Sequence, residues 1–241
     1  MNRAMFAAAS GMAAQQLELE VVADNLANAD VAGFKGATET FADVRAGGIG
    51  LGTVAVGRHP VFVQGKLERS GGPFDLAIDG PGFFVVERDG QRAYTRAGAF
   101  ARQADGRVRD AAGWALAGVR IPADAIAVRV ARDGRVSVDV PGQADRTIAH
   151  LRLAEFPAPE ALRPLSATLF ARTEASGRPG LIVPGMRGGP SLAFGMLEKS
   201  TVSIVESMMQ ILGAQRAYEA NAKGVQAADE MLRIANNLHR G

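Results

Sequence analysis

The first stretch of the sequence that could do chemistry is rich in glycine. Residues 50–55 read Gly-Leu-Gly-Thr-Val-Ala and match the loose pattern G-x-G-x-x-A, with which dinucleotide-binding proteins bring a pyrophosphate to the N-terminus of a helix. That chemistry needs a strand before the pattern and a helix after it. Here a glycine-rich segment precedes the pattern, and the strand-like runs Val54-Ala55-Val56 and Val61-Phe62-Val63 follow it. We therefore interpret the stretch as part of an extended arm and predict no bound dinucleotide.

The ionisable side chains do not form a recognisable catalytic or metal-binding set. The histidines His59, His150 and His239 are far apart in the sequence, and none has a second ligand at metal-binding spacing. Asp75 and Asp79 are close together, but Asp79 precedes a glycine and favours a turn over acid–base catalysis. The chain has no cysteine, which excludes disulfides and thiolate chemistry. We therefore expect neither an enzyme nor a bound cofactor.

The composition is that of a globular protein without a nucleic-acid or membrane partner. The 241 residues are 47% hydrophobic and 22% charged, with a net charge of +2 and no basic run with interleaved aromatics. No apolar run reaches the length of about eighteen residues that a membrane-spanning helix needs, so we expect no membrane insertion. Arg3 and the alanine-rich stretch after it are similar to a short signal peptide, but Ser10 and Gly11 interrupt that stretch. We therefore predict that the N-terminus is not cleaved.

Both ends of the chain carry side chains at the seven-residue spacing of a coiled-coil seam. The predicted seam residues are Met5, Met12, Leu19 and Leu26 near the N-terminus, and Ile204, Met208, Ile211, Tyr218, Val225 and Leu232 near the C-terminus. Ser203 and Glu206 have the spacing of a capping box at the start of the second helix, and Gly33 follows the end of the first. A long amphipathic helix can also pack on its own domain. We predict that the two helices pair as a coiled coil and that neighbouring subunits cover their remaining apolar faces.

The middle of the chain has the alternation and the turn residues of short β-strands. Asp89-Gly90 and Asp133-Gly134 each separate two runs of β-forming residues, as in a hairpin. Short strands at such spacing are typical of an antiparallel β domain. The prolines between residues 157 and 164 are expected to end its regular part, and the Gly- and Pro-rich residues 174–190 to form a loop.

The sequence thus predicts an α+β fold in three parts. Residues 1–36 and 200–241 form a terminal helical coiled-coil domain. Residues 37–66, which are rich in glycine, form a linker or an extended arm. Residues 67–199 form a central antiparallel β-rich domain.

Several motifs resemble signatures of the bacterial flagellar rod and hook proteins. The first helix closes on Asn25-Leu26-Ala27-Asn28 and Gly33-Phe34-Lys35, and the last helix carries Gln215-Arg216-Ala217-Tyr218-Glu219. Residues 64–84, 94–106 and 195–200 continue the resemblance in the same order. Five motifs in register across nearly the whole chain are more specific than any one of them. The chain is therefore identified as a member of the flagellar basal-body rod family, and its motifs are most similar to those of distal rod proteins.

The resemblance implies a structural subunit and no enzymatic activity. In this family the paired terminal helices line an axial tube, and subunits stack helically across the periplasm as the drive shaft that passes torque to the hook. The implied partners are further copies of the chain, other rod and hook proteins and the flagellar type III export apparatus, which exports the chain without cleaving a signal peptide. The expected assembly residues are the seam, buried only on assembly, and the motif residues Asn25, Asn28, Gly33, Phe34, Gln215, Arg216, Tyr218 and Glu219.

Alternatives to the distal rod remain open at this point. The arm at residues 43–63 looks shorter than that of a distal rod protein, which makes a proximal rod subunit of the same family the rival interpretation. Outside the family, a secreted β-domain binding module on a helical stalk has the same order of elements, although 6% aromatic residues is little for a recognition patch. An enzyme without a known motif would need a deep pocket with convergent titratable groups.

Overall fold

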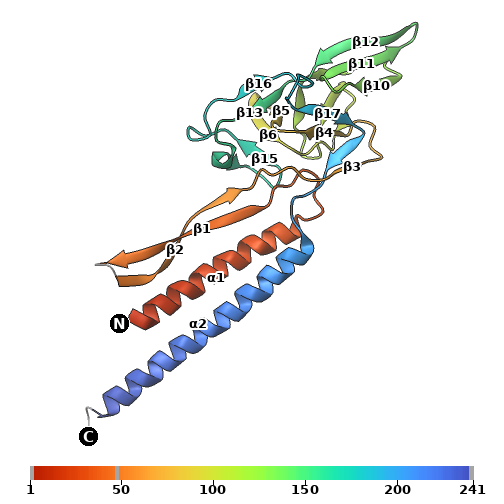
Figure 1. Ribbon diagram of the computed structural model, residues 1–241. Coiled ribbons are helices and arrows are strands. Elements are labelled where there is room, and N and C mark those ends of the chain that lie inside the picture. Colours follow the sequence, from red (N-terminus) through yellow and green to blue (C-terminus); the bar gives the residue numbers. More distant parts are fainter. Residues whose placement is uncertain (1–2, 47–48, 239–241) are drawn as a thin grey trace. The chain divides into compact units, whose positions relative to one another are not determined.

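The computed structural model describes residues 3–46 and 49–238, except for the side chains of residues 3, 4, 46, 49–51, 232 and 235–238. The chain divides into two compact units (Figure 1). The helical unit consists of residues 1–29, 37–61 and 202–241, and the β-rich unit consists of residues 30–36 and 62–201. The chain therefore passes from one unit to the other four times.

Two long helices make up most of the helical unit. α1 spans Arg3–Ala27 and α2 spans Ile204–Leu238, and they run antiparallel and side by side (Figure 1). At the end of α1, the Asp24 carbonyl oxygen accepts from the Asn28 side-chain amide at 2.8 Å and from the Asn28 backbone amide at 3.3 Å, and these two bonds close the last turn. At the start of α2, the Glu206 amide donates to the Ser203 hydroxyl oxygen at 3.4 Å. This bond confirms Ser203 as the N-terminal cap of α2, which is one half of the predicted capping box.

Residues 37–60 form a β-hairpin in the same unit. β1 (Ala37–Ala46) and β2 (Ile49–Pro60) pair antiparallel, and both strands contact α1. The segment expected as a linker or extended arm thus pairs with itself. Residues 50–55 lie within β2, and β3 is the next element, so the glycine-rich pattern is not followed by the helix that a pyrophosphate site requires.

The β-rich unit is built from short strands and one turn of 3-10 helix, η1 (Pro159–Ala161). The strands are β3 (Leu67–Arg69), β4 (Leu76–Asp79), β5 (Phe83–Arg88), β6 (Gln91–Thr95), β7 (Ala101–Arg102), β8 (Arg107–Arg109), β9 (Ala115–Arg120), β10 (Ala127–Val130), β11 (Arg135–Val140), β12 (Gln143–His150), β13 (Leu153–Glu155), β14 (Arg163–Pro164), β15 (Leu169–Ala171), β16 (Gly180–Ile182), β17 (Ser191–Phe194) and β18 (Met196–Glu198). Their shortness follows from the many turn residues of this region.

The strand pairings of this unit are antiparallel. The largest sheet has the order β14-β15-β6-β5-β9-β8-β7, and β13 pairs with both β5 and β16. β10, β11 and β12 form a separate sheet, while β4 pairs with β17 and β3 with β18. The predicted hairpins are confirmed: β5 and β6 meet at Asp89-Gly90, and Val130 pairs with Val136 across Asp133-Gly134. With the two helices, these sheets confirm the α+β class and the β-rich domain.

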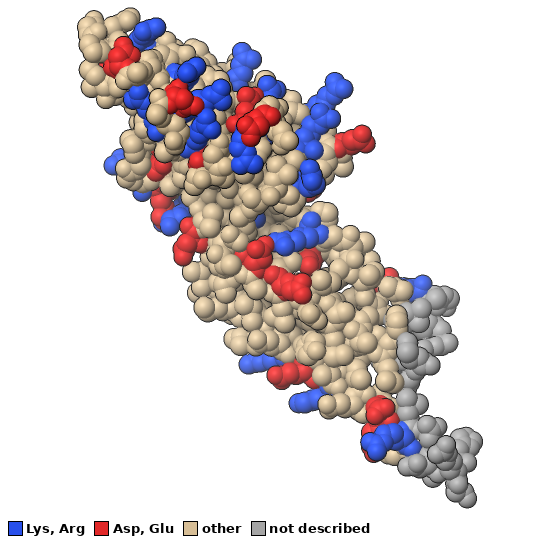
Figure 2. Space-filling view, turned by 180° about the vertical axis from the view of Figure 1, so that it is seen from behind, with Lys and Arg blue, Asp and Glu red and all other residues tan. Residues whose placement is uncertain are grey.

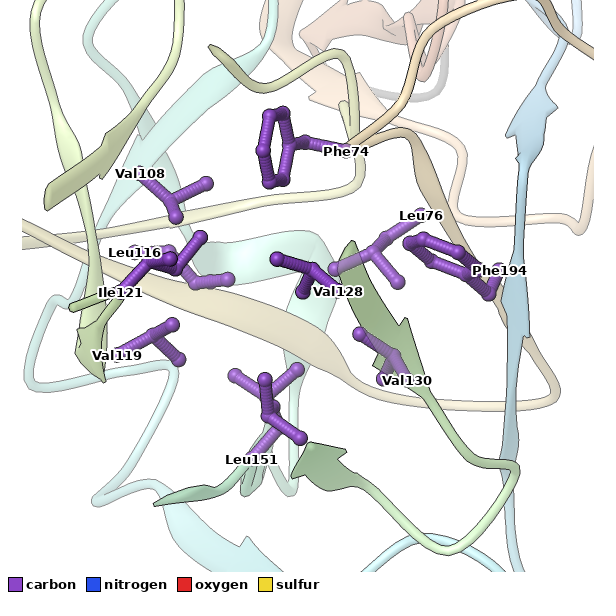
Figure 3. Close-up of a pocket in the computed structure, with 11 residues that line it drawn as sticks. Phe74, Leu76, Val108, Leu116, Val119, Ile121, Val128, Val130, Leu151 and Phe194 are labelled. Carbon is purple, nitrogen blue, oxygen red and sulfur yellow. The ribbon is translucent and has the colours of Figure 1, made fainter. Parts of the chain in front are cut away.

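The core of the β-rich unit is apolar and tightly filled. Phe84, Val86 and Leu153 are fully buried, and Trp114 lies in the same cluster. A void of about 20 Å³ remains, lined by the apolar side chains that Figure 3 shows. Such a void stays dry and offers a ligand no polar group, so we assign it to packing and not to binding.

The prediction for the end of the β domain was wrong. Regular structure continues past Pro164 as β15 to β18, and residues 174–190, expected as a loop, contain β16. β16 forms because its residue Leu181 pairs with Ala154 of β13. A strand of this length depends on its partner, and no local pattern in the sequence reveals such a tertiary pairing.

Candidate assembly surfaces and a buried ion cluster

Small side chains line the contact between α1 and α2. On α2 the buried residues Ser207, Ala214 and Ala228 repeat at intervals of seven or fourteen, and Asn221 completes the series. On the α1 side, Gly11 lies opposite Asn221, where an added Cβ would come within 3.0 Å of the Asn221 side-chain nitrogen. Small residues at this spacing let two helix backbones approach closely.

The predicted seam residues are partly half-buried and partly exposed. The half-buried ones are Met5, Met12, Leu19, Leu26, Ile211 and Val225. The exposed ones are Ile204, Met208 and Tyr218, with 43%, 53% and 42% of their surface accessible. Leu232 belongs to α2, but its side chain lies outside the described residues. Whether assembly buries this set stays a prediction.

Sequence reasoning selected large apolar side chains and therefore missed the small ones. The series at positions 207, 214, 221 and 228 also repeats every seven residues and could have been found. Serine and asparagine are polar and alanine is small, so a search for large apolar side chains at seven-residue spacing does not detect them.

A second face of α2 points away from α1, and we call it the outer face. It is formed by Val205, Met209, Leu212, Arg216 and Lys223, which follow each other at helical spacing. The first three have 68%, 62% and 54% of their surface accessible. Arg216 and Lys223 are exposed, and neither makes an ion pair within the described chain. Gln215, Tyr218 and Glu219, which belong to the same motif as Arg216, are exposed as well.

A groove of about 190 Å³ lies elsewhere in the helical unit, and we call it the acidic groove. Its lining comes from α1 between Glu18 and Asn25, from β1 between Ala37 and Phe41, and from Gln210 of α2. One carboxylate oxygen of Glu39 is buried there without a hydrogen-bond partner.

Figure 2 shows that charged side chains are dense over the β-rich unit and sparse over the helical unit on the face it displays.

The carboxylates around this groove are poorly compensated. Burial raises the pKa of Glu39, and the nearby carboxylates Glu20 and Glu18 raise it further, although Arg58 acts in the opposite direction. Arg58 itself forms an ion pair with Asp24. The groove therefore has an excess of negative charge.

Motif residues at the end of α1 fix the start of the hairpin. The Asn25 side chain donates to the Ala37 carbonyl oxygen and accepts from the Ala37 amide, both at 2.8 Å. Asn25 therefore acts as the pairing partner of the first residue of β1. At the other end of the hairpin, the Ser10 hydroxyl oxygen accepts from the Thr53 amide at 3.2 Å.

A cluster of three charged side chains is buried in the β-rich unit. Lys35 donates to one carboxylate oxygen of Glu198 and to the Val63 carbonyl oxygen, both at 2.6 Å. Arg96 lies 3.6 Å from the other carboxylate oxygen of Glu198. The side chains of Lys35 and Glu198 are fully buried, and that of Arg96 is 5% exposed.

Two backbone amides donate hydrogen bonds to Glu198 and so tie their chain segments to the cluster. The Gly65 amide donates to Glu198 at 2.7 Å, and the Gly33 amide donates to the Glu198 carbonyl oxygen at 2.7 Å. Gly33 has φ +71°, and a Cβ there would come within 2.3 Å of the Ala97 nitrogen. Glycine is therefore required at this position. Phe34, the next motif residue, is buried.

This cluster brings together three motifs that are distant in the sequence. Lys35, Arg96 and Glu198 each belong to a different stretch of the resemblance, and sequence reasoning did not connect them. Burial lowers the pKa of Lys35 and that of Arg96, while Glu198 acts in the opposite direction on both. Each group is enclosed by the unit, so the cluster is suited to holding segments in place and not to acid–base chemistry.

The described part of the chain contains no group of three His, Cys, Asp or Glu side chains that could hold a metal ion. Among the residues that the structure covers, no helix is long and apolar enough to cross a membrane. The features that stand out are packing surfaces and a buried structural cluster.

Paired terminal helices with an exposed apolar face and a separate β-rich unit are the features of a structural subunit that assembles with others. Three family models match the chain in order. They are "Flagella basal body rod protein" over residues 5–35, "Flagellar hook protein FlgE/F/G D1 domain" over residues 77–138 and "Flagellar basal body rod FlgEFG protein C-terminal" over residues 194–238.

Relatives that match over nearly the full length of both chains identify the type of rod protein. The flagellar basal-body rod protein FlgG of Agrobacterium fabrum is 36% identical, over 97% of this chain and 98% of its own. FlgG of Borreliella burgdorferi is 34% identical over 100% of both chains, and FlgF of Caulobacter vibrioides is 30% identical over 98% and 97%. The chain belongs to the flagellar basal-body rod protein family and, within it, to the distal rod type. It is a structural protein of the basal body and not an enzyme, as the sequence predicted.

Proposed function

We propose that copies of this chain polymerise helically into the part of the rod that crosses the periplasm and transmits torque to the hook. The observation that supports this most directly is the outer face of α2. Three large apolar side chains there are more than half exposed, while the opposite face of α2 packs on α1. Burying such a side chain contributes about 1.5–3 kcal/mol, so a partner that covers this face would be bound favourably.

The proposed assembly uses heterologous contacts, in which one surface of a subunit meets a different surface of the next. Such contacts generate open helical polymers when the rotation between subunits does not close a ring. In this proposal the terminal helices pair as a coiled coil. The helical unit, residues 1–29, 37–61 and 202–241, forms the inner domain, and the β-rich unit, residues 30–36 and 62–201, forms the outer one. The predicted seam residues, Leu232 included, become fully buried only between subunits.

The remaining partners are proposed from the family. Other rod and hook proteins continue the axis at its two ends, and the flagellar type III apparatus exports the chain without removing an N-terminal peptide. Mass spectrometry of the chain from purified hook–basal bodies tests the export route. Peptides from residues 1–15 support it, whereas a chain that begins beyond residue 15 contradicts it.

Assembly itself can be tested with two matched methionine variants. Met209→Glu places a charge on the outer face of α2, and Met186→Glu places the same charge at a site in the β-rich unit that is 69% exposed. Sedimentation and electron microscopy of the purified full-length protein should show polymers for the wild type and for Met186→Glu, and mainly monomers for Met209→Glu. A wild type that stays monomeric at every concentration would contradict the proposal.

A further inference from the structure

Resting on the proposed assembly, we infer that the outer face of α2 in one copy docks at the acidic groove of a second copy, with Arg216 and Lys223 meeting Glu18 and Glu39. The partner is thus a second copy of this chain. The contact joins two different surfaces and so allows an open polymer.

The cations of the outer face are available for such a contact. Arg216 and Lys223 lie seven residues apart on one face of α2, and within the described chain no carboxylate pairs with either. Helix geometry separates them by about 10 Å along the axis. Because they follow Val205, Met209 and Leu212 along the same face, one docking event would bury apolar surface and bring both charges to the partner.

The acidic groove offers complementary features. Two carboxylates line it, that of Glu18 on α1 and that of Glu39 on β1. The buried oxygen of Glu39 has no donor, and a buried acceptor left unpaired costs about 1–3 kcal/mol. Arg58, the cation that lowers the pKa of Glu39, is already paired with Asp24. A guanidinium or ammonium from outside would satisfy Glu39 and remove this cost.

One apolar side chain at the groove is accessible to the outer face. Phe41 of β1 lines the groove beside the carboxylates with 36% of its surface accessible, whereas Val21 and Val22 of α1 are already buried beneath it. An interface with an apolar centre and charges that fix the register is the usual arrangement for specific association. A second copy of the chain already carries both an exposed apolar face and two cations, unpaired within the described chain, on the same face of one helix.

Charge reversal on each surface gives a test in which two defective proteins should rescue each other. One protein carries Arg216→Glu and Lys223→Glu, and the other carries Glu18→Lys and Glu39→Lys. Alone, each places like charges at the contact, and we expect the critical concentration for polymerisation to rise at least about tenfold. In an equimolar mixture every contact can again pair opposite charges, so the critical concentration should return to within about twofold of the wild-type value.

Matched controls separate this contact from general charge effects. Arg178→Glu with Arg187→Glu makes the same change of charge at exposed positions of the β-rich unit and should polymerise like the wild type. The milder pair Arg216→Gln with Lys223→Gln should raise the critical concentration about three- to fivefold, which keeps the test valid if a reversed protein folds poorly. Fluorescence of Trp114 and the helical circular dichroism signal verify folding.

The outcomes distinguish the inference from the proposed function. If the wild type polymerises and the mixture is no better than either reversed protein alone, the docking contact is wrong while assembly stands. The same holds if the reversed proteins polymerise like the wild type. A wild type that forms no polymer overturns the proposed assembly itself.

Discussion

Replacing Glu198 tests whether the buried ion cluster stabilises the β-rich unit. Glu198→Gln keeps the size of the side chain but removes the negative charge between Lys35 and Arg96, which then remain buried as two uncompensated cations. Removing one partner of a buried ion pair costs about 3–5 kcal/mol. Since a folded domain is stable by only about 5–15 kcal/mol, the loss would be a large part of the total.

Urea unfolding followed by tryptophan fluorescence measures this loss. Trp114 is the only tryptophan and is buried in the core of the same unit, so its emission reports the unfolding of that unit. The midpoint should fall strongly with Glu198→Gln. Glu87→Gln, which breaks the exposed pair between Glu87 and Arg92, should leave the midpoint nearly unchanged. A loss below about 1 kcal/mol for Glu198→Gln would refute the reasoning, because a desolvated cluster cannot lose its anion so easily.

Two further comparisons sharpen this test. Lys35→Met leaves Glu198 paired with Arg96, so its loss of stability should be smaller than that of Glu198→Gln. Because burial lowers the pKa of Lys35 below its usual 10.5, the folded state releases that proton before the unfolded state does. The unfolded state then binds more protons, and stability rises with pH in the range below 10.5. The deficit of Glu198→Gln should therefore shrink as the pH rises toward that value.

Three other predictions concern the hairpin, the sheet and the acidic groove. Gly52 has φ +125° and faces Ser10, so Gly52→Ala should destabilise the hairpin by about 1–3 kcal/mol in thermal unfolding, whereas Gly213→Ala, in the open interior of α2, should stabilise by up to about 1 kcal/mol. A backbone hydrogen bond lowers the pKa of Asp139, so its stabilisation is lost as the pH falls below 3.8, and Asp139→Asn should flatten the acid limb of the stability curve. Because the pKa of Glu39 is raised in the folded state, the stability of the wild type falls as the pH rises above 4.5. Glu39→Gln should therefore make the free monomer more stable at neutral pH and have no such advantage below pH 4.5. The same variant should assemble less readily than the wild type.

Much of the fold could be predicted because its signals are local. The Asp-Gly turns with alternating flanks define hairpins, and Ser203 marks the start of α2 by a bond within one turn. The seven-residue spacing located both helices. β16 was missed because it forms by pairing with β13, a strand distant in the sequence, and by packing Ile182 against the core.

The candidate site was predictable only in part. Asn25, Gly33 and Phe34 were chosen by resemblance, and the structure gives Asn25 and Gly33 backbone roles that a motif alone does not reveal. The cluster of Lys35 and Glu198 joins residues 163 positions apart, and no periodicity connects such a pair. The outer face of α2 was missed because the search followed one seam, although a helix in an assembly can present two.

Electron cryo-microscopy of the assembled polymer tests the central claim most directly. The map should show Val205, Met209 and Leu212 of one copy covered by another copy, with Arg216 beside Glu39 of that neighbour. A polymer in which these apolar side chains face open solvent, with Arg216 and Glu39 far from any partner, would contradict the account.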